Sequence, residues 1–235
     1  MTSDRTSLHA LVLADGDRPA RTALDAAWPG WDDRVALVVA ADGGAGLAAE
    51  LGIVPDRWVG DGDSIAPDDL ADLERRGVTI LRASPDKDES DSELALLEAV
   101  RAGATEITVL GALGGRRVDH LLANVALLTH PALAGIPTRL VDNRTRVTLV
   151  DAGPGPASVR RDLTGRIGDV VSLLPWGGEV ETVSTSGLRY PLMRERLLAG
   201  PARGLSNIRT DSGAWIEVRG GRLLVVESPA TLGAS

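Results

Sequence analysis

The sequence predicts an α/β protein, with an N-terminal, doubly wound, mainly parallel sheet domain followed by a small all-β sandwich domain. Two observations predict this architecture. Up to about residue 140, short apolar runs alternate with stretches of helical spacing, as is typical of βαβ units. Beyond that point helical stretches nearly vanish, and short alternating segments follow one another between glycine-rich turns. We therefore expect one domain over 1–140 and a second over 141–235.

The first domain is expected to contain six strands joined by helices. The expected strands are 11–14, 35–41, 57–60, 78–82, 107–111 and 137–141, and the expected helices between them include 46–51, 68–76, 92–102 and 119–128. The second domain is expected to hold the strands 146–150, 157–161, 169–174, 179–183, 215–218 and 222–226. Because open α/β sheets bind ligands at the carboxyl ends of their strands, polar residues just after the first-domain strands are candidates for a site.

Composition excludes several classes of function. The chain has 235 residues and a formal net charge of −8, which disfavours binding to nucleic acid, and phosphate chemistry would need a divalent cation. It contains no cysteine and three histidines, so thiolate zinc sites and cysteine nucleophiles are absent and a histidine-built metal site is not expected. No run approaches the roughly 20 apolar residues of a membrane helix. The N-terminus does not resemble a signal peptide, so we expect a cytoplasmic protein without a membrane partner.

An acidic loop follows the third expected strand. Asp61 and Asp63 stand two residues apart between glycines. Two such carboxylates can point together at one cation, while the glycines let the backbone approach phosphate oxygens. Asp-Gly pairs also form ordinary turns, so the loop alone indicates a metal site only weakly.

A second acidic loop, 86–91, precedes the third of the expected helices. Ser90 and Glu93 form a capping box, and Asp91 in the first turn complements the helix dipole. Lys87 makes the loop unusual, because it is the only lysine in the chain. Lysine is a compact point charge that can reach phosphate oxygens, whereas arginine is a planar fork.

A glycine-rich turn, 111–115, lies between a strand and a helix and is followed by Arg116. Its backbone N–H groups can bind an anion, and Arg116 can add charge-assisted hydrogen bonds. The turn has neither the Walker spacing nor that of a dinucleotide fingerprint. Asp119 and His120 could form part of a catalytic triad, but no G-x-S-x-G elbow is present, and a capping or core role for His120 is equally compatible.

Taken in order, these motifs resemble the thiamine pyrophosphokinase family. The matching segments are Asp42-Gly43-Gly44, Gly60-Asp61-Gly62-Asp63-Ser64, Lys87-Asp88-Glu89-Ser90-Asp91 and 111–124, followed by 168–175, 185–190 and 204–207. The resemblance covers nearly the whole chain, roughly residues 8 to 226. Two departures concern the acceptor side: Tyr190 stands where tryptophan is common, and the hydroxyl residues upstream of Ser206 are replaced.

The resemblance implies transfer of the β,γ-pyrophosphoryl group of ATP to the hydroxyl of thiamine, with Mg2+ required and AMP released. The implied metal ligands are Asp61, Asp63 and Asp91, and the implied ATP contacts are Asp42, Gly43, Gly44, Lys87, Arg116, Asp119 and Asn124. Lys87 and Asp119 join the metal ligands as the expected catalytic residues, with Asp119 as the proton acceptor. The thiamine site is expected to use Tyr190, Ser206 and Asn207, with Trp176 as an alternative stacking ring. The family also implies a homodimer with active sites at the subunit interface.

Other functions remain open at this point. The same donor site could serve a pyrophosphokinase that acts on another heterocyclic alcohol, such as a hydroxymethyl pterin. A nucleotide-binding module could keep the acidic loops without turnover. Magnesium-dependent phosphatase chemistry would need a nucleophilic aspartate or an activated water that the sequence does not identify. Product analysis separates these, because only pyrophosphoryl transfer to an alcohol releases AMP in an acceptor-dependent way.

Overall fold

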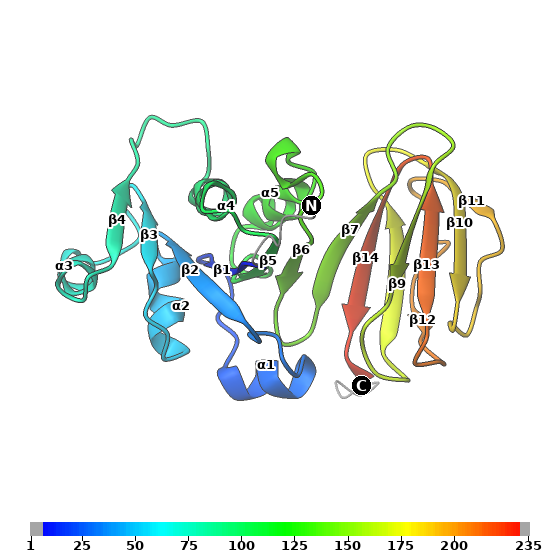
Figure 1. Cartoon of the computed structure of the whole chain (residues 1–235), viewed down its shortest axis with the longest axis horizontal. Coiled ribbons are helices and arrows are strands. Elements are labelled where there is room, and N and C mark those ends of the chain that lie inside the picture. Colours follow the sequence, from blue (N-terminus) through cyan, green and yellow to red (C-terminus); the bar gives the residue numbers. More distant parts are fainter. Residues whose placement is uncertain (1–6, 231–235) are drawn as a thin grey trace, which may run out of the picture. The chain divides into compact units, whose positions relative to one another are not determined.

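The computed structural model describes residues 7–230 and divides the chain into two compact units, Met1–Asn143 and Arg144–Ser235 (Figure 1). The division falls close to the expected one between residues 140 and 141. In the part of the chain described, no helix is long and apolar enough to cross a membrane.

The first unit contains a six-stranded sheet whose neighbouring strands are all parallel, in the order β6-β5-β1-β2-β3-β4. The strands are β1 (His9–Leu13), β2 (Val35–Ala41), β3 (Arg57–Gly60), β4 (Thr79–Arg82), β5 (Glu106–Leu110) and β6 (Thr138–Val141). The direction of winding reverses between β1 and β5. This confirms the predicted parallel sheet and places a switch point beside the ends of both strands.

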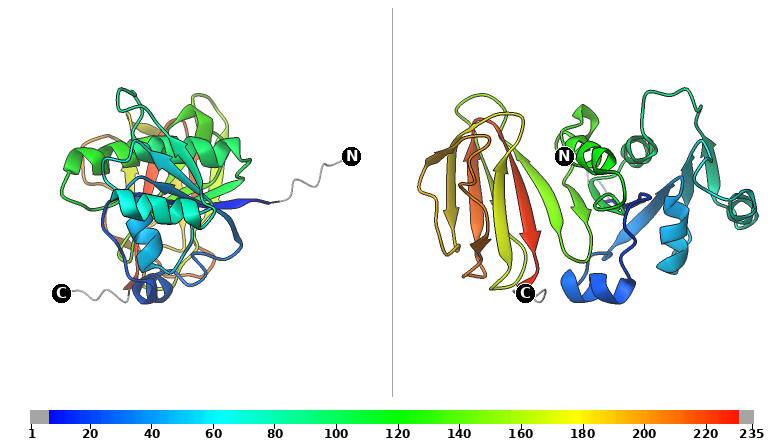
Figure 2. Two further views of the ribbon diagram at one scale, coloured as in Figure 1. Left: turned by 90° about the vertical axis from the view of Figure 1, so that its left-hand side faces the viewer. Right: turned by 180° about the vertical axis from the view of Figure 1, so that it is seen from behind.

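Helices cover both faces of this sheet. They are α1 (Arg21–Ala27), α2 (Gly44–Glu50), α3 (Pro67–Arg75), α4 (Asp91–Arg101) and α5 (Val118–Leu127), with a short 3-10 helix, η1, at Pro131–Leu133. Helices α1 and α2 lie on one face, and α4 and α5 lie on the other (Figures 1 and 2). Leu11, Leu24 and Leu47 belong to one buried cluster that joins α1 and α2 to the strands. The doubly wound arrangement is therefore confirmed.

The second unit consists of two antiparallel sheets, β12-β9-β14-β7 and β11-β10-β13-β8. Its strands are β7 (Arg146–Asp151), β8 (Ser158–Asp162), β9 (Val170–Pro175), β10 (Val180–Ser186), β11 (Glu195–Leu197), β12 (Asn207–Ile208), β13 (Trp215–Arg219) and β14 (Arg222–Ser228). Alternate residues of both sheets, among them Val150, Leu173, Val183 and Ile216, form one buried core. The predicted all-β sandwich is confirmed.

Four short elements were not predicted from the sequence: α1, η1, β11 and β12. Helix α1 has no side-chain cap at its start and no acidic residue in its first turn. Strand β12 has only two residues, which is too short for alternation to be recognised. These elements form because tertiary packing and strand pairing stabilise segments whose local signals are weak.

Candidate active site

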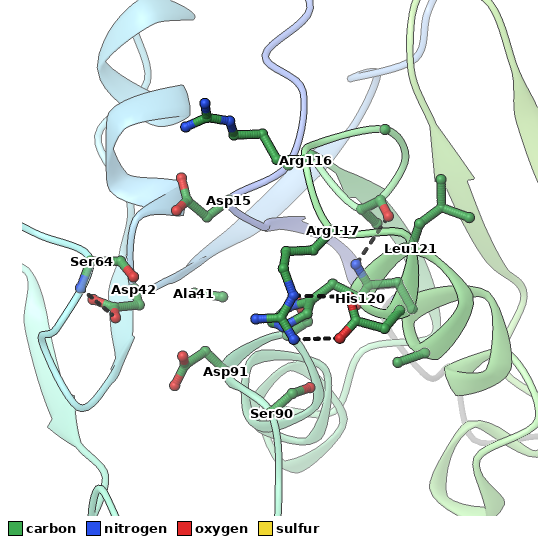
Figure 3. Close-up of a pocket in the computed structure, with 18 of the residues that line it drawn as sticks. Asp15, Ala41, Asp42, Ser64, Ser90, Asp91, Arg116, Arg117, His120 and Leu121 are labelled. Carbon is green, nitrogen blue, oxygen red and sulfur yellow. Dashed lines mark hydrogen bonds and ion pairs between the residues drawn. The ribbon is translucent and has the colours of Figure 1, made fainter.

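A cavity of about 690 Å³ opens where β1, β2 and β5 end, beside the switch point of the parallel sheet (Figure 3). Acidic residues and Lys87 line one part of it, and the glycine-rich turn with its arginines lines another. The predicted site residues that line the cavity are Asp42, Asp61, Lys87, Asp91, Arg116, Asp119 and Asn124. Gly43, Gly44 and Asp63 were also predicted for the site, but they are not among the lining residues.

Asp42 follows β2 and has a left-handed backbone with φ of 41°. Its N–H donates to the carbonyl of Val59 at 2.9 Å, and its carbonyl accepts the Ala45 N–H at 3.1 Å. Oδ2 accepts the Ser64 N–H at 3.1 Å, whereas the buried Oδ1 has no hydrogen-bond partner among the described residues. Burial raises the pKa of the Asp42 carboxyl to about 6. A buried carboxylate oxygen without a hydrogen-bond partner lowers the stability of the folded protein unless a ligand binds to it.

Gly43 and Gly44 allow the end of β1 to approach the start of α2. A Cβ atom at residue 43 would lie 2.4 Å from the Asp15 carboxylate, and one at residue 44 would lie 2.0 Å from the Leu13 carbonyl oxygen. Residue 44 therefore excludes a side chain, because backbone stands in the way, whereas a side chain at residue 43 would have to displace the Asp15 carboxylate. Packing accounts for these glycines, and their predicted contact with ATP stays a prediction.

Lys87 lies between two carboxylates that come from different elements. Its Nζ is 3.3 Å from Asp61 Oδ2, just after β3, and 2.5 Å from Asp91 Oδ1, at the start of α4. Ser90 caps that helix by accepting the Glu93 N–H at 3.2 Å, which fixes the direction of its first turn. Desolvation opposes the charge on Lys87, but the hydrogen bonds and charges of Asp91 and Asp61 outweigh it and raise the pKa of the ammonium.

The carboxylates of Asp42, Asp61 and Asp91 can each offer one oxygen so that all three oxygens lie within 4.8 Å of one another. Figure 3 shows Asp42 and Asp91 at the same opening. Oxygen ligands of this kind suit Mg2+, and the unpartnered Oδ1 of Asp42 supplies a free donor atom. The donor set therefore fits a magnesium ion. We call these three residues the carboxylate cluster.

The cluster differs in one member from the predicted ligand set of Asp61, Asp63 and Asp91. Asp63 Oδ1 accepts the Ser64 hydroxyl at 2.8 Å, and its backbone N–H donates to Asp61 Oδ1 at 3.1 Å. Asp42, predicted as an ATP contact, takes the third place in the cluster because the left-handed turn after β2 directs its side chain there. A ligand role for Asp63 stays a prediction.

The glycine-rich turn is held against the loop that follows β1. Gly114 and Gly115 both have positive φ, and a Cβ atom at residue 114 would lie 2.1 Å from Asp17 Oδ2. Asp17 Oδ1 accepts the Gly115 N–H at 2.9 Å, so this N–H is already used within the chain. Asn124 Nδ2 donates to the Ala112 carbonyl at 3.0 Å and anchors the other end of the turn to α5.

Two arginines follow this turn and differ in their partners. Arg116 has no ion pair among the described residues and lines the cavity, so its guanidinium is available to an anion. Arg117 Nε donates to Asp119 Oδ1 at 2.9 Å, and its Nη2 also contacts Oδ2 (Figure 3). The Arg117 hydrogen bonds lower the pKa of the Asp119 carboxyl to about 2. A carboxylate of such low pKa is a weak base, which argues against Asp119 as the proton acceptor.

The sequence interpretation missed the loop after β1. Asp15 and Gly16 line the cavity, and Arg18 bridges Asp15 and Glu50 at 3.1 Å each. The rule applied to the other strands would have found this loop, because Asp15 and Asp17 are polar residues directly after an apolar strand.

In the second unit, Tyr190 and Asn207 form one local group. The Tyr190 N–H donates to Asn207 Oδ1 at 3.0 Å, and Asn207 Nδ2 donates to the Tyr190 carbonyl at 2.7 Å. The neighbouring Ser206 N–H donates to Ser172 Oγ at 3.0 Å. The Tyr190 ring is 56% exposed, which leaves it free to stack on a ligand.

Trp176 lies away from this group. Asn207 pairs with Val171 near the start of β9, whereas Trp176 comes directly after the end of that strand. At about 3.3 Å per residue, the separation along β9 is roughly 16 Å. Trp176 instead lines a separate cavity of about 350 Å³ with Glu179 and Glu181. The structure therefore does not bring Trp176 together with Tyr190 and Asn207 within this unit.

Comparisons with known proteins indicate the same family for both units of the chain. The family model for the thiamin pyrophosphokinase catalytic domain matches residues 31–140, and the model for the thiamin pyrophosphokinase vitamin B1 binding domain matches residues 158–223. The chain is 27% identical over 199 residues to the thiamine pyrophosphokinase of Bacillus subtilis (strain 168), which covers 85% of this chain and 90% of that protein.

Solved structures show the same architecture. The thiamin pyrophosphokinase of Geobacillus thermodenitrificans is 28% identical, with a TM-score of 0.76 over 94% of this chain and 97% of that one. The Bacillus subtilis structure, at 24% identity, has the same fold with a TM-score of 0.79 over 94% and 99% of the two chains. With both family models matched in order, the chain belongs to the thiamin pyrophosphokinase family.

Proposed function

We propose that the chain is a magnesium-dependent thiamine pyrophosphokinase that converts ATP and thiamine into AMP and thiamine diphosphate. The observation that carries the proposal is the carboxylate cluster, in which Lys87 bridges Asp61 and Asp91. The cluster shares a cavity with the glycine-rich turn and Arg116. This arrangement suits phosphoryl transfer, in which catalysis consists mainly of positioning and neutralising charge.

In the proposed reaction, the thiamine hydroxyl oxygen forms a bond to the β-phosphorus of ATP. The bond between that phosphorus and the oxygen bridging to the α-phosphorus breaks, AMP leaves, and the hydroxyl proton is released. Mg2+ would be held by Asp42, Asp61 and Asp91 and would supply neutralisation of phosphate charge. Lys87 and Arg116 would bind phosphate oxygens and stabilise the charge that develops during transfer.

Product analysis tests the proposal. Purified protein is incubated with ATP and Mg2+, with and without thiamine, and nucleotides and thiamine esters are separated by chromatography. We expect AMP and thiamine diphosphate in equal amounts, only when thiamine is present, and no turnover with excess EDTA. Release of orthophosphate without thiamine would indicate a phosphatase. ATP binding without AMP formation would indicate another heterocyclic alcohol or a non-catalytic module.

The Asp119→Asn variant is expected to reduce kcat by less than about tenfold, since general base catalysis typically contributes 10² or more and Asp119 is a weak base. Because Arg117 lowers the pKa of Asp119 to about 2, this carboxyl stays ionised across the pH range of the assay. The shape of the pH–rate profile above pH 5 should therefore be the same as in the wild type. A hundredfold loss accompanied by loss of the acidic limb would restore Asp119 as the proton acceptor.

Tyr190→Ala is expected to raise the KM for thiamine about tenfold, as loss of one stacking contact of about 1.4 kcal/mol implies, and to leave the KM for ATP unchanged. Trp176→Ala is the matched control, since this ring lies at the other end of β9. It should change the KM for thiamine by less than about twofold. Steady-state kinetics with each substrate varied separately measure both constants. The reverse pattern would assign substrate stacking to Trp176.

A homodimer with active sites at the subunit interface is part of the proposal. Tyr190, Met193, Leu198 and Leu205 are exposed apolar residues of the second unit, which supports a contact surface there. Mixing Lys87→Met subunits with Tyr190→Ala subunits tests it, with thiamine kept well below its wild-type KM so that both parents turn over slowly. If each site uses both chains, mixed dimers contain one site with both native residues, and the mixture should be more active than the average of the two parents. Light scattering gives the oligomeric state independently. A cytoplasmic location stays a prediction.

A further inference from the structure

Trp58 occupies an unusual place beneath the candidate active site. It lies in β3, three residues before Asp61, and its side chain has no exposed surface. Ala40, Ala45 and Leu70 belong to the same buried cluster. A core position of this kind needs apolar volume, which leucine, isoleucine or phenylalanine could also supply. Volume alone therefore does not explain a tryptophan here.

The indole N–H provides what those residues lack. Trp58 Nε1 donates to the backbone carbonyl of Asp42 at 3.0 Å, in a buried hydrogen bond. The same carbonyl also accepts the Ala45 N–H, so two donors hold it in place. Asp42 needs such support because its φ of 41° lies in the left-handed region, which costs a residue with a side chain about 1 kcal/mol or more.

Trp58 also lies under the loop that carries Asp61. A Cβ atom built at Gly62 would be 3.9 Å from Cη2 of the indole and 3.7 Å from Arg82 Nη1, so the ring lies beside that loop. At Gly60, a Cβ atom would lie 2.8 Å from the Cβ of Asp42, so β3 must pass close against the left-handed turn. One side chain thus forms a hydrogen bond to the segment after β2 and lies beside the loop after β3.

We infer that Trp58 is a positioning residue for the metal site, because its indole N–H holds the Asp42 backbone. Its ring also lies beside the Gly62 loop, next to Asp61. This inference rests on the proposed function, since it concerns the carboxylate cluster as a Mg2+ site. Without the indole hydrogen bond, the Asp42 turn would have more conformational freedom. Its carboxylate would then be less often in a position to bind the same ion as Asp61 and Asp91.

The test uses Trp58→Phe, which keeps an aromatic ring in the core and removes the N–H. The matched control is Trp28→Phe. Trp28 is also buried and also donates its indole N–H to a backbone carbonyl, that of Asp142 at 2.6 Å, but it belongs to the core cluster of α1. Binding of Mn2+, as a spectroscopic substitute for Mg2+, is measured by electron paramagnetic resonance without nucleotide. The unfolding midpoint of each apo variant is measured in parallel.

We expect Trp58→Phe to weaken Mn2+ binding about tenfold, as is typical when a residue that orients a metal ligand is lost. The Mg2+ concentration for half-maximal turnover should rise by a similar factor. The Mn2+ affinity of Trp28→Phe should be within about twofold of that of the wild type, even if its unfolding midpoint falls by as much as that of Trp58→Phe. Equal Mn2+ affinity of Trp58→Phe and the wild type would overturn the inference. A wild-type protein that binds no Mn2+ would instead contradict the metal site of the proposed function.

A measurement on the wild-type chain covers the case in which Trp58→Phe does not fold. The five tryptophans give five indole N–H resonances in a 15N-labelled sample, and Trp→Phe variants at the other four positions assign them by elimination. Titration with Mg2+ should shift the Trp58 resonance, because its acceptor is the backbone of a ligand, and should leave the Trp28 resonance unchanged. An unshifted Trp58 resonance at saturating Mg2+ would overturn the inference.

Discussion

Asp42→Asn is expected to reduce magnesium-dependent turnover about a thousandfold, since loss of roughly 4 kcal/mol of metal-derived charge stabilisation corresponds to that factor. The substitution removes one of the three charges in the carboxylate cluster. Asparagine has nearly the same shape and can still accept the Ser64 N–H, so the turn after β2 should remain folded. The loss should therefore appear as weak Mg2+ binding and low kcat in a folded protein.

The same variant should be at least as stable as the wild type when no metal is present. Burial raises the pKa of the Asp42 carboxyl from its ordinary 3.8 to about 6, so the folded state holds this proton more tightly than the unfolded state. Wild-type stability in EDTA should consequently fall, relative to the variant, as pH rises from about 4 to about 6. Thermal unfolding across this pH range measures the difference.

Asp63→Asn is the informative comparison for Asp42→Asn. Asp63 was predicted as a ligand from the sequence but lies outside the carboxylate cluster. If the cluster alone holds Mg2+, Asp63→Asn should retain far more activity and Mg2+ affinity than Asp42→Asn. If instead Asp63→Asn is inactive and Asp42→Asn is not, the ligand set is the one predicted from the sequence, and the assignment of Asp42 is wrong.

Lys87→Met is expected to lower kcat by about 10² to 10³, the usual loss when one preorganised group that stabilises transition-state charge is removed. The Lys87 side chain is only 12% exposed and its ammonium is held by Asp61 and Asp91, so its position is fixed before substrate binds. Lys87→Arg keeps the charge but replaces a compact ammonium by a planar fork. Its activity should lie between those of Lys87→Met and the wild type.

Metal binding separates this effect from a general disturbance of the site. Lys87 neutralises part of the charge of the cluster, so Lys87→Met should bind Mn2+ at least as tightly as the wild type although its turnover is low. Arg101→Met is the control at the far end of α4, the helix that begins at Asp91, because the Arg101 side chain is 66% exposed and pairs with Glu98 at 3.6 Å. It should leave kcat and Mn2+ affinity unchanged. A fully active Lys87→Met would remove lysine from the catalytic group.

Much of the fold could be predicted from the sequence, because the central strands of the parallel sheet are buried on both faces. Strand β2, for example, is a continuous apolar run whose residues 37–41 are all buried. Helix α4 is marked by its own cap at Ser90. Strands β11 and β12 were missed, since two or three residues carry too little pattern and pairing with β10 and β9 decides their conformation.

Most residues of the candidate site could be predicted from the sequence, but which of their side chains meet could not. Asp61, Lys87 and Asp91 were expected from their positions after β3 and before α4, and they do meet. The direction of the Asp42 side chain was not foreseeable, because it follows from a left-handed turn supported by contacts with Trp58. No local pattern around residue 42 reports a hydrogen bond to residue 58.

Hydrophobic periodicity and turn residues act locally, so they were sufficient to predict the longer strands and helices in their order and the polar residues at the strand ends. The grouping of the carboxylate oxygens and the separation of Trp176 from Tyr190 could be recognised only in the folded chain. Both depend on distances between segments far apart in the chain, and those distances are set by strand pairing and by contacts across the core. In this protein, local sequence patterns therefore identify the residues that can perform the chemistry, and tertiary packing brings them together in one site.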